Sequence, residues 1–312
     1  MNATRNRLDA TRWHWQHGPI DLILSADGET AAVDAAYHAC WSRFVDVLPE
    51  LVSELKLLRQ AVSEDAALSD CPLKGAVARR MWNASHAHRA RFITPMAAVA
   101  GSVADELIAV FARQGVARAF INNGGDIALY LSEGQRYRIG VFADLAQYSA
   151  RTAAEEQPLD ANLTLDASTP VRGIATSGWR GRSFSLGIAD SVTVLARDAA
   201  TADAAATMIA NAVDLDHAGI VRRPASSLKD DSDLGELRVT VDVPVLPLPL
   251  IDFALARGVE IAWRLVEQGV IEGAALFLQG RTRVVGIHRT RGLLAPRAAT
   301  TTEAPCSTYA AC

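Results

Sequence analysis

The stretch TPMAAVAGSVADELIAVFARQGVARAFINNGGDIALYL, residues 94–131, sets the expected fold around it. Thr94 suits a helix N-cap, and Pro95 suits the first helical position, which needs no amide donor. Apolar residues then recur at helical spacing as far as Gly115, whose tolerance of positive φ suits a helix end. We therefore predict a helix that begins after Thr94, followed by two buried strands, residues 116–121 and 127–131.

An Asn-Asn-Gly-Gly-Asp turn, residues 122–126, joins these two strands. Its glycines can adopt positive φ and offer consecutive amides to an anion, beside two side-chain amides and a carboxylate. An ordinary Asn-Gly hairpin turn explains the same residues. The residues alone leave both interpretations open.

Composition limits the classes of protein. The chain has 312 residues, of which 50% are hydrophobic and 21% charged, so it can bury the core of one large domain or of two. A net charge of -4 gives no indication of nucleic-acid binding. We find no apolar run of membrane-spanning length and no signal-peptide core, and we expect a cytoplasmic protein with a small-molecule ligand and no membrane association. Cys40, Cys71, Cys306 and Cys312 lack metal-binding spacing.

On the N-terminal side, residues 13–25 predict a strand, a turn at Gly18-Pro19 and a second strand, with His17 at the mouth of the turn. Residues 29–61 have helical spacing, and Pro49 predicts a break into two helices. Residues 76–89 predict a further helix that carries His86 and His88. Two residues apart on a helix, these histidines point in different directions, which argues against a shared metal.

On the C-terminal side, the same reasoning gives a series of shorter elements. We predict a third antiparallel strand (137–142), a loop (147–170), a buried strand (191–196), an Ala-rich helix (199–213), an exposed linker (215–235), a strand (237–243), a helix (251–268) and a closing hairpin (274–278 with 283–288). The segment from 292 to 312 lacks a core pattern and is predicted to be a disordered tail, which leaves residues 1–291 as a single domain.

Two further segments carry candidate binding chemistry. Ser177 and Gly178 can bind a phosphate or carboxylate, with Arg180 and Arg182 adding positive charge, although a hairpin with exposed arginines explains them equally well. Asp203 and Thr207 stand four residues apart and therefore share one helix face. Their oxygens suit a hard cation but are only part of a coordination shell, and without other information a solvent-facing Asp is the simpler interpretation.

The order of these motifs resembles the ApbE-like superfamily, whose best-known members are FAD-dependent protein FMN transferases. The motifs are a helix with an internal Asp105, N-x-G-G-D-I, then A-T-S-G (residues 175–178), S-V-T-V (191–194) and A-D-x-x-x-T (202–207). The runs HGPIDL, TPMAAVAG, NNGGDI, ATSGWRGRSFSLGIADSV and ADAAAT together resemble its uncharacterised branch, uncharacterised protein family 0280. This resemblance implies an α+β fold of antiparallel sheets with packed helices, related to the T-fold.

The resemblance also implies a site. It adds a flavin or flavin-like ligand and Mg²⁺ to the expectations, and it raises His17 to a site candidate because HGPIDL recurs in that branch. The candidate catalytic residues are His17, Asp126, Ser177 and Arg180. The candidate cofactor-binding residues are Asn122, Asn123, Gly124, Gly125, Thr176, Gly178 and Arg182, and the candidate metal ligands are Asp203 and Thr207.

Two departures from the flavin transferases bear on activity. Those enzymes resemble this chain around residues 99–105 but carry Lys-Gly where it has Ala100-Gly101, and their His-bearing loop is replaced here by the short segment 183–190. We therefore predict an enzyme, a transferase or hydrolase, that acts on a small heterocyclic or nucleotide-like substrate of flavin or pterin type and does not flavinylate proteins. A non-catalytic ligand-binding or assembly protein is the alternative, and an Mg-dependent FMN transferase the third. The sequence leaves a homodimer open.

Overall fold

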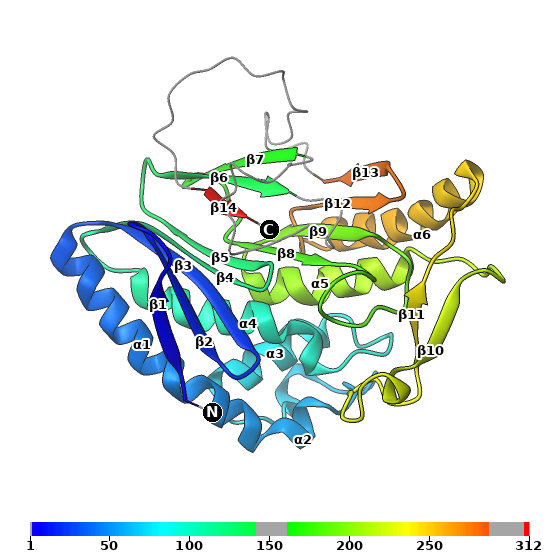
Figure 1. Ribbon diagram of the computed structural model, residues 1–312, viewed down its shortest axis with the longest axis horizontal. Helices are drawn as coiled ribbons and strands as arrows, with labels where there is room; N and C mark the ends of the chain where they lie inside the picture. Colours follow the sequence, from blue (N-terminus) through cyan, green and yellow to red (C-terminus); the bar gives the residue numbers. More distant parts are fainter. Residues whose placement is uncertain (1, 142–160, 287–308, 312) are drawn as a thin grey trace, which may run out of the picture.

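A computed structural model describes residues 2–141, 161–286 and 309–311 of the chain (Figure 1). The helices are α1 (Thr30–Ser53), α2 (Leu55–Leu58), α3 (Ala76–His86), α4 (Val99–Ile108), α5 (Ala199–Ala212) and α6 (Leu248–Glu267). The strands are β1 (Thr4–Arg7), β2 (Arg12–His17), β3 (Ile20–Gly28), β4 (Val116–Asn123), β5 (Asp126–Leu131), β6 (Arg136–Val141), β7 (Ala161–Asp166), β8 (Gly173–Ser177), β9 (Ser191–Ala196), β10 (Val221–Pro224), β11 (Arg238–Asp242), β12 (Gly273–Leu278), β13 (Arg281–Val285) and β14 (Tyr309–Ala311). The predicted α+β class is confirmed.

A nine-stranded sheet in the order β1-β2-β3-β4-β5-β8-β9-β12-β13 forms the centre of the molecule, and all its neighbouring strands are antiparallel. The helices cover one face, and a small sheet of β14, β6 and β7 lies over the other (Figure 1). Side chains alternate between the two faces as a pleated strand requires. On β4, Ile121 packs among the helices while its neighbour Phe120 packs under the small sheet.

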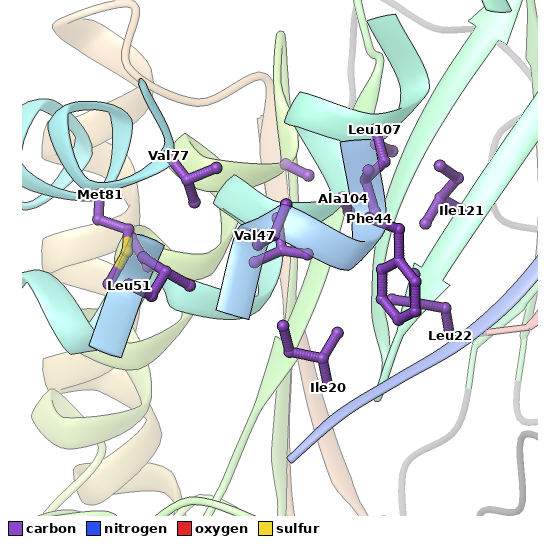
Figure 2. Packing of buried hydrophobic residues seen from close by; sticks show 14 of the residues in the cluster. Ile20, Leu22, Phe44, Val47, Leu51, Val77, Met81, Ala104, Leu107 and Ile121 are labelled. Carbon is purple, nitrogen blue, oxygen red and sulfur yellow. The ribbon is translucent and has the colours of Figure 1, made fainter. Parts of the chain in front are cut away.

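The helical face of β3 and β4 is covered by α1 and α4, and α3 packs against α4 in the same cluster. Figure 2 shows Phe44, Val47 and Leu51 of α1 in one cluster with Leu22 of β3 and Leu107 of α4. All of these side chains are buried. This cluster holds the N-terminal half of the sheet against the helices that lead to the β4–β5 turn.

Helix α5 lies between two hydrophobic clusters. Its residues Ala204 and Met208 pack with the α1–α3–α4 cluster, whereas Ala202, Ala205 and Ile209 pack with β9, β12 and α6. The small alanine side chains allow neighbours to approach α5 closely on both of these sides, while the face that carries Asp203, Thr207 and Asn211 is only half-buried.

The predicted break at Pro49 is wrong. Helix α1 continues through Pro49 to Ser53, and the chain turns only at Glu54. Pro49 is exposed, while Phe44, Val47 and Leu51 are buried on the opposite side of the helix. Burial of this continuous apolar face compensates for the hydrogen bond that the proline cannot donate.

Thr94 does not cap a helix with its side chain, contrary to prediction. Pro95–Ala98 form a 3-10 turn before α4, and the Thr94 hydroxyl donates to Asp233 instead. Thr94 thus connects the start of this region to a segment 139 residues later in the chain.

Three other predictions need correction. Strand β6 exists but pairs with β7 in the small sheet and does not extend the main sheet, and β7 occupies part of the predicted loop 147–170. The predicted linker 215–235 contains β10, which pairs with β11. Most of the predicted tail, like residues 142–160, lies outside the described residues, and Tyr309–Ala311 form a strand parallel to β6.

Candidate functional site

A cavity of about 270 Å³ opens between α4, α5 and two loops. Its wall combines carboxylates, cations and apolar side chains. The lining residues are Arg59, Phe92, Ile93, Thr94, Met96, Ala97, Val99, Ala100, Asp126, Arg182, Ser183, Phe184, Leu186, Asp203, Thr207, Met208, Asn211, Lys229, Asp231, Ser232, Asp233 and Leu234. The cavity thus brings together Asp126, Arg182, Asp203 and Thr207 from three of the predicted site segments.

Asp203 and Thr207 reach the cavity from successive turns of α5. A four-residue spacing places both side chains on the same helix face. Asp203 Oδ2 accepts a hydrogen bond of 2.9 Å from the amide of Gly101 on α4, which fixes the carboxylate where the two helices meet.

Asp126 enters from the sheet as the first residue of β5. Its Oδ1 accepts from the amide of Thr176 on the adjoining strand β8 at 3.2 Å. The side chain is buried, and this removal from water raises the pKa of Asp126 well above its ordinary value, although the Thr176 amide and the charge of Arg182 act in the opposite direction.

The two carboxylates are close enough to affect each other. Loss of solvent is the largest cause that raises the pKa of Asp203, and the negative charge of Asp126 is the next. A cation between them would relieve this repulsion, and carboxylate and hydroxyl oxygens suit a hard divalent ion. Within the described ranges no cluster of three or more His, Cys, Asp or Glu could hold a metal, so water or a ligand would complete the shell.

The turn between β4 and β5 is a hairpin turn, one of the two interpretations that the sequence left open. Asn122 Oδ1 accepts from the Gly125 amide at 2.8 Å, and Asn123 Nδ2 donates to the Ala100 carbonyl at 3.1 Å. Gly124 has a φ of +70°, and a Cβ there would lie 2.7 Å from a guanidinium nitrogen of Arg182. The asparagines therefore support the turn, and the missing side chain of Gly124 makes room for Arg182 beside Asp126.

Most of the A-T-S-G-W-R segment lies beside the cavity without lining it. The Thr176 and Thr193 hydroxyls share a hydrogen bond of 2.9 Å. The Arg180 guanidinium stacks over the Trp179 ring at 4.8 Å, and the Trp179 indole donates to Asp190. Ser177 and Arg180 are not among the residues that line the cavity, whereas Arg182 is.

His17 is likewise not among the residues that line the cavity. Its side chain is buried at the end of β2, and its ring packs edge-on against Phe44 of α1 with 6.0 Å between the centroids. This environment gives His17 a packing role in the α1 cluster.

The sequence analysis missed several residues of the site. Arg59, Lys229 and residues 231–234 line the cavity, yet all of these except Arg59 fall in the segment predicted to be a linker. A run of charged residues, KDDSD, was the available signal, but such runs are usually solvated, and only the fold brings this one to the cavity.

Asp105 connects the two helices at the back of the site. From α4 it accepts from the amides of Ala199 and Ala200 at 3.0 and 2.8 Å, and so caps the N-terminus of α5. Loss of solvent, followed by the charge of Asp198, raises the pKa of Asp105 to about 7. Together with the Gly101–Asp203 bond, this gives α4 and α5 reciprocal contacts between carboxylates and amides.

Comparison with known proteins relates this chain to a family. A family model described as AbpE bacteria matches residues 5–284. A UPF0280 protein from Methanosphaerula palustris is 41% identical over 122 residues, which are 39% of this chain and 47% of the relative. One from Methanothrix thermoacetophila is 36% identical over 150 residues, 46% of this chain and 56% of the relative. The chain spans about half the length of the curated relatives it matches.

Solved structures give a more distant likeness. An ApbE protein from Thermotoga maritima aligns with a TM-score of 0.43 and 13% identity, covering 92% of this chain and 97% of that one. The flavin transferase ApbE from Vibrio cholerae aligns with a TM-score of 0.40 and 13% identity, covering 92% and 98%.

Proposed function

The chain belongs to the ApbE-like family, and from this premise we propose that it is an enzyme, a transferase or hydrolase, acting on a small heterocyclic or nucleotide-like molecule of flavin or pterin type. The substrate carries a phosphate, and Asp203, Thr207 and Asp126 would hold Mg²⁺, which would supply a positive charge for that phosphate.

The observation that carries this proposal is the pair of carboxylates, Asp126 and Asp203, that line the same cavity. Burial raises the pKa of both carboxyl groups, and the charge of Asp126 raises that of Asp203 further, so the ionised pair is costly to keep together unless a positive charge joins them. Bound Mg²⁺ would supply that charge and neutralise a phosphate, while water and phosphate oxygens would complete its shell.

The rest of the cavity fits a flat ring with an anionic group. Phe92, Met96, Phe184 and Met208 supply apolar and aromatic surface. The cationic side chains of Arg182 and Lys229 also line the wall and can attract an anion, whereas Arg59 in the same wall is paired with Asp231. The cavity volume of about 270 Å³ is close to the lower end of small-molecule sites, which suits one ring system and not an extended polymer.

The carboxyl groups of the cavity are the groups that would transfer protons in this site. A carboxyl group with a raised pKa exchanges protons closer to neutral pH and is suited to general acid or base catalysis. Asp126 is buried and bonded to the Thr176 amide, so its remaining oxygen can accept or donate a proton at a bound ligand. The packing of His17 against Phe44 removes it from this proposal.

Loss of flavin transfer to proteins is part of the proposal. Segment 183–190 replaces the family's His-bearing loop, and its Ser183, Phe184 and Leu186 lie directly on the cavity wall. These three side chains offer no group that could accept a proton from a threonine hydroxyl. A non-catalytic ligand-binding or assembly protein is the second candidate, favoured by the position of Ser177 and Arg180 outside the cavity lining. An Mg-dependent FMN transferase is the third.

Calorimetric titration of the purified protein with FMN, FAD and a phosphorylated pterin, each with and without Mg²⁺, tests the proposal. We expect binding that requires Mg²⁺ and that Asp203→Asn abolishes. Asp252→Asn is the matched control, because Asp252 pairs with Arg281 and Arg283 and is not among the lining residues. Mass spectrometry of the incubated ligands then separates an enzyme, which converts one of them, from a binding protein. Equal binding by Asp203→Asn and the parent would contradict the proposal.

A further inference from the structure

Residues 226–237, which we call the strap, connect β10 to β11 and extend over the cavity. Lys229, Asp231, Ser232, Asp233 and Leu234 of the strap all line it. In Figure 1 the β10–β11 hairpin, in yellow, runs down the right-hand side of the molecule toward the level of α2. The strap therefore forms one wall of the candidate site, although it belongs to neither α4 nor α5.

Two polar contacts fasten the strap to the opposite side of the cavity. Arg59, which follows α2, donates to Asp231 at 2.7 Å. The Thr94 hydroxyl donates to Asp233 at 2.5 Å. Both anchoring residues line the cavity themselves, so these two contacts, which we call the latch, bridge its mouth.

The other hydrogen bonds of the strap within the described part of the chain are mostly internal to it, such as that from the Ser226 amide to the Gly235 carbonyl. Ala225 and Val239, just outside its two ends, are fully buried and fix it to the fold. Between them, each residue from 226 to 237 is exposed or only half-buried. Segments with few buried apolar contacts open locally at low free-energy cost, while their buried ends act as fixed points. The strap thus combines firm ends with a centre that depends on a few polar bonds.

We propose that the strap is a latched cover that opens for each ligand exchange and that restricts the site to freely diffusing small molecules. The identity of the ligand in this inference rests on the proposed function, whereas the latch rests on the two contacts alone. A ring of flavin or pterin size can enter while the strap is open and then be enclosed when Asp231 and Asp233 rebind Arg59 and Thr94. An acceptor that is part of a protein would keep the strap from closing.

Lys229 makes the open state measurable without any ligand. Lys229 is exposed, but trypsin requires an extended segment on both sides of the cleaved bond, so cleavage after Lys229 requires the strap to leave its folded conformation at the cavity wall. Cleavage of a rapidly opening segment follows the population of its open form. We expect Asp231→Asn to speed this cleavage about threefold, because exposed ion pairs are weak. The double variant Asp231→Asn/Asp233→Asn should speed it about tenfold or more, because the hydrogen bond from Thr94 to a carboxylate is stronger. Asp252→Asn, which removes a surface ion pair elsewhere, should leave the rate unchanged.

Stopped-flow binding of FMN with Mg²⁺ measures the gating. The association and dissociation rate constants should both rise several-fold in the double variant, with a smaller change in their ratio. Equal trypsin rates in the parent and in the double variant would overturn the latch, and equal FMN rate constants would overturn the gating. Failure of FMN to bind any variant would contradict the proposed function, and the trypsin comparison would still decide whether the latch exists.

Discussion

At the scale of single residues, Asp126 links stability to pH. Its pKa is raised in the folded protein, so the folded state holds a proton that the unfolded state has already released. The free energy of unfolding therefore decreases as pH rises from about 4, the unfolded pKa, through the folded pKa. The negative charge of Asp126, which the proposed Mg²⁺ site requires, therefore destabilises the folded protein when no cation is bound.

Asp126→Asn should consequently stabilise the protein above neutral pH. We expect a gain of about 1–3 kcal/mol at pH 8 and little or none at pH 4, where the parent side chain is largely protonated. Urea unfolding at both pH values measures the difference, and Asp252→Asn serves as a control on an exposed carboxylate. A gain of equal size at the two pH values would show that charge is not its origin.

The same substitution should weaken Mg²⁺ binding even as it stabilises the fold. Removing one of two carboxylates leaves a weaker field for a divalent ion, and we expect the Mg²⁺ affinity of the ligand complex to fall at least about tenfold. Titration followed by calorimetry reports the affinity. Retention of Mg²⁺ by the parent through dialysis without any ligand would contradict the weak, ligand-dependent site proposed here.

At the scale of elements, the crossing of α4 and α5 depends on Gly101. A Cβ at this position would lie 2.2 Å from the Ala199 carbonyl oxygen, which is backbone and cannot move aside cheaply. We expect Gly101→Ala to destabilise the protein by about 3 kcal/mol. Denaturant unfolding measures this, with the neighbouring Ser102→Ala as control.

Ser102 is a suitable control because it is equally buried on the same helix. Its hydroxyl has no hydrogen-bond partner within the described part of the chain, so Ser102→Ala should be neutral or slightly stabilising. Equal losses from the two substitutions would mean that the whole of α4, and not the close crossing, is sensitive to change.

Pro49 offers the opposite case in α1. The helix already accommodates the proline, at the cost of one backbone hydrogen bond, and the side chain is exposed. Pro49→Ala should therefore stabilise the protein by about 1–3 kcal/mol, less any entropy that the unfolded chain regains. Thermal unfolding monitored by circular dichroism would show the change, and a loss of stability would mean that the proline shapes the helix for its neighbours.

Local patterns explain why most elements were predictable. The β2–β3 and β12–β13 hairpins, α5 and α6 each have a period and end signals within a short stretch of sequence. The continuous α1 was not predictable, because the burial that outweighs Pro49 comes from β3 and α4, distant in sequence. The placement of β6 and the pairing of β10 with β11 likewise depend on non-local contacts.

The candidate site was predictable only in part. The i, i+4 spacing of Asp203 and Thr207 predicted their shared face, but only the family resemblance set them beside the β4–β5 turn. His17, Ser177 and Arg180 are close in sequence to strand ends, and no local pattern shows that their side chains lie outside the cavity lining. The strap gave no periodic hydrophobic signal, because its leucines are exposed or half-buried and polar bonds connect it to Arg59 and Thr94.

At the scale of the whole molecule, we expect no flavin transfer to a protein acceptor. The sequence resemblance implies that segment 183–190 stands in place of a His-bearing loop, and our proposal is that proton transfer is lost with it; positioning with proton transfer commonly supplies many powers of ten in rate. Incubation with FAD, Mg²⁺ and a known acceptor domain, followed by in-gel fluorescence, tests this against an active flavin transferase. Labelling that disappears in Asp203→Asn would restore the transferase as the leading candidate.

No helix among the described residues is long and apolar enough to cross a membrane. Helix α5 joins the two larger hydrophobic clusters, because it contributes side chains to both of them.

This shared helix determines how freely the chain can vary in sequence. A surface helix has a solvated side on which most substitutions are neutral, but all the alanines of α5 are buried, and its remaining face, with Asp203 and Thr207, lines the cavity. In a library of all single substitutions we therefore expect α5 to be the least tolerant helix of the fold, and α1, with its exposed face, to be among the most tolerant. We therefore expect the residues around Asp203 and Thr207 to tolerate fewer substitutions than those of any other helix in the described structure.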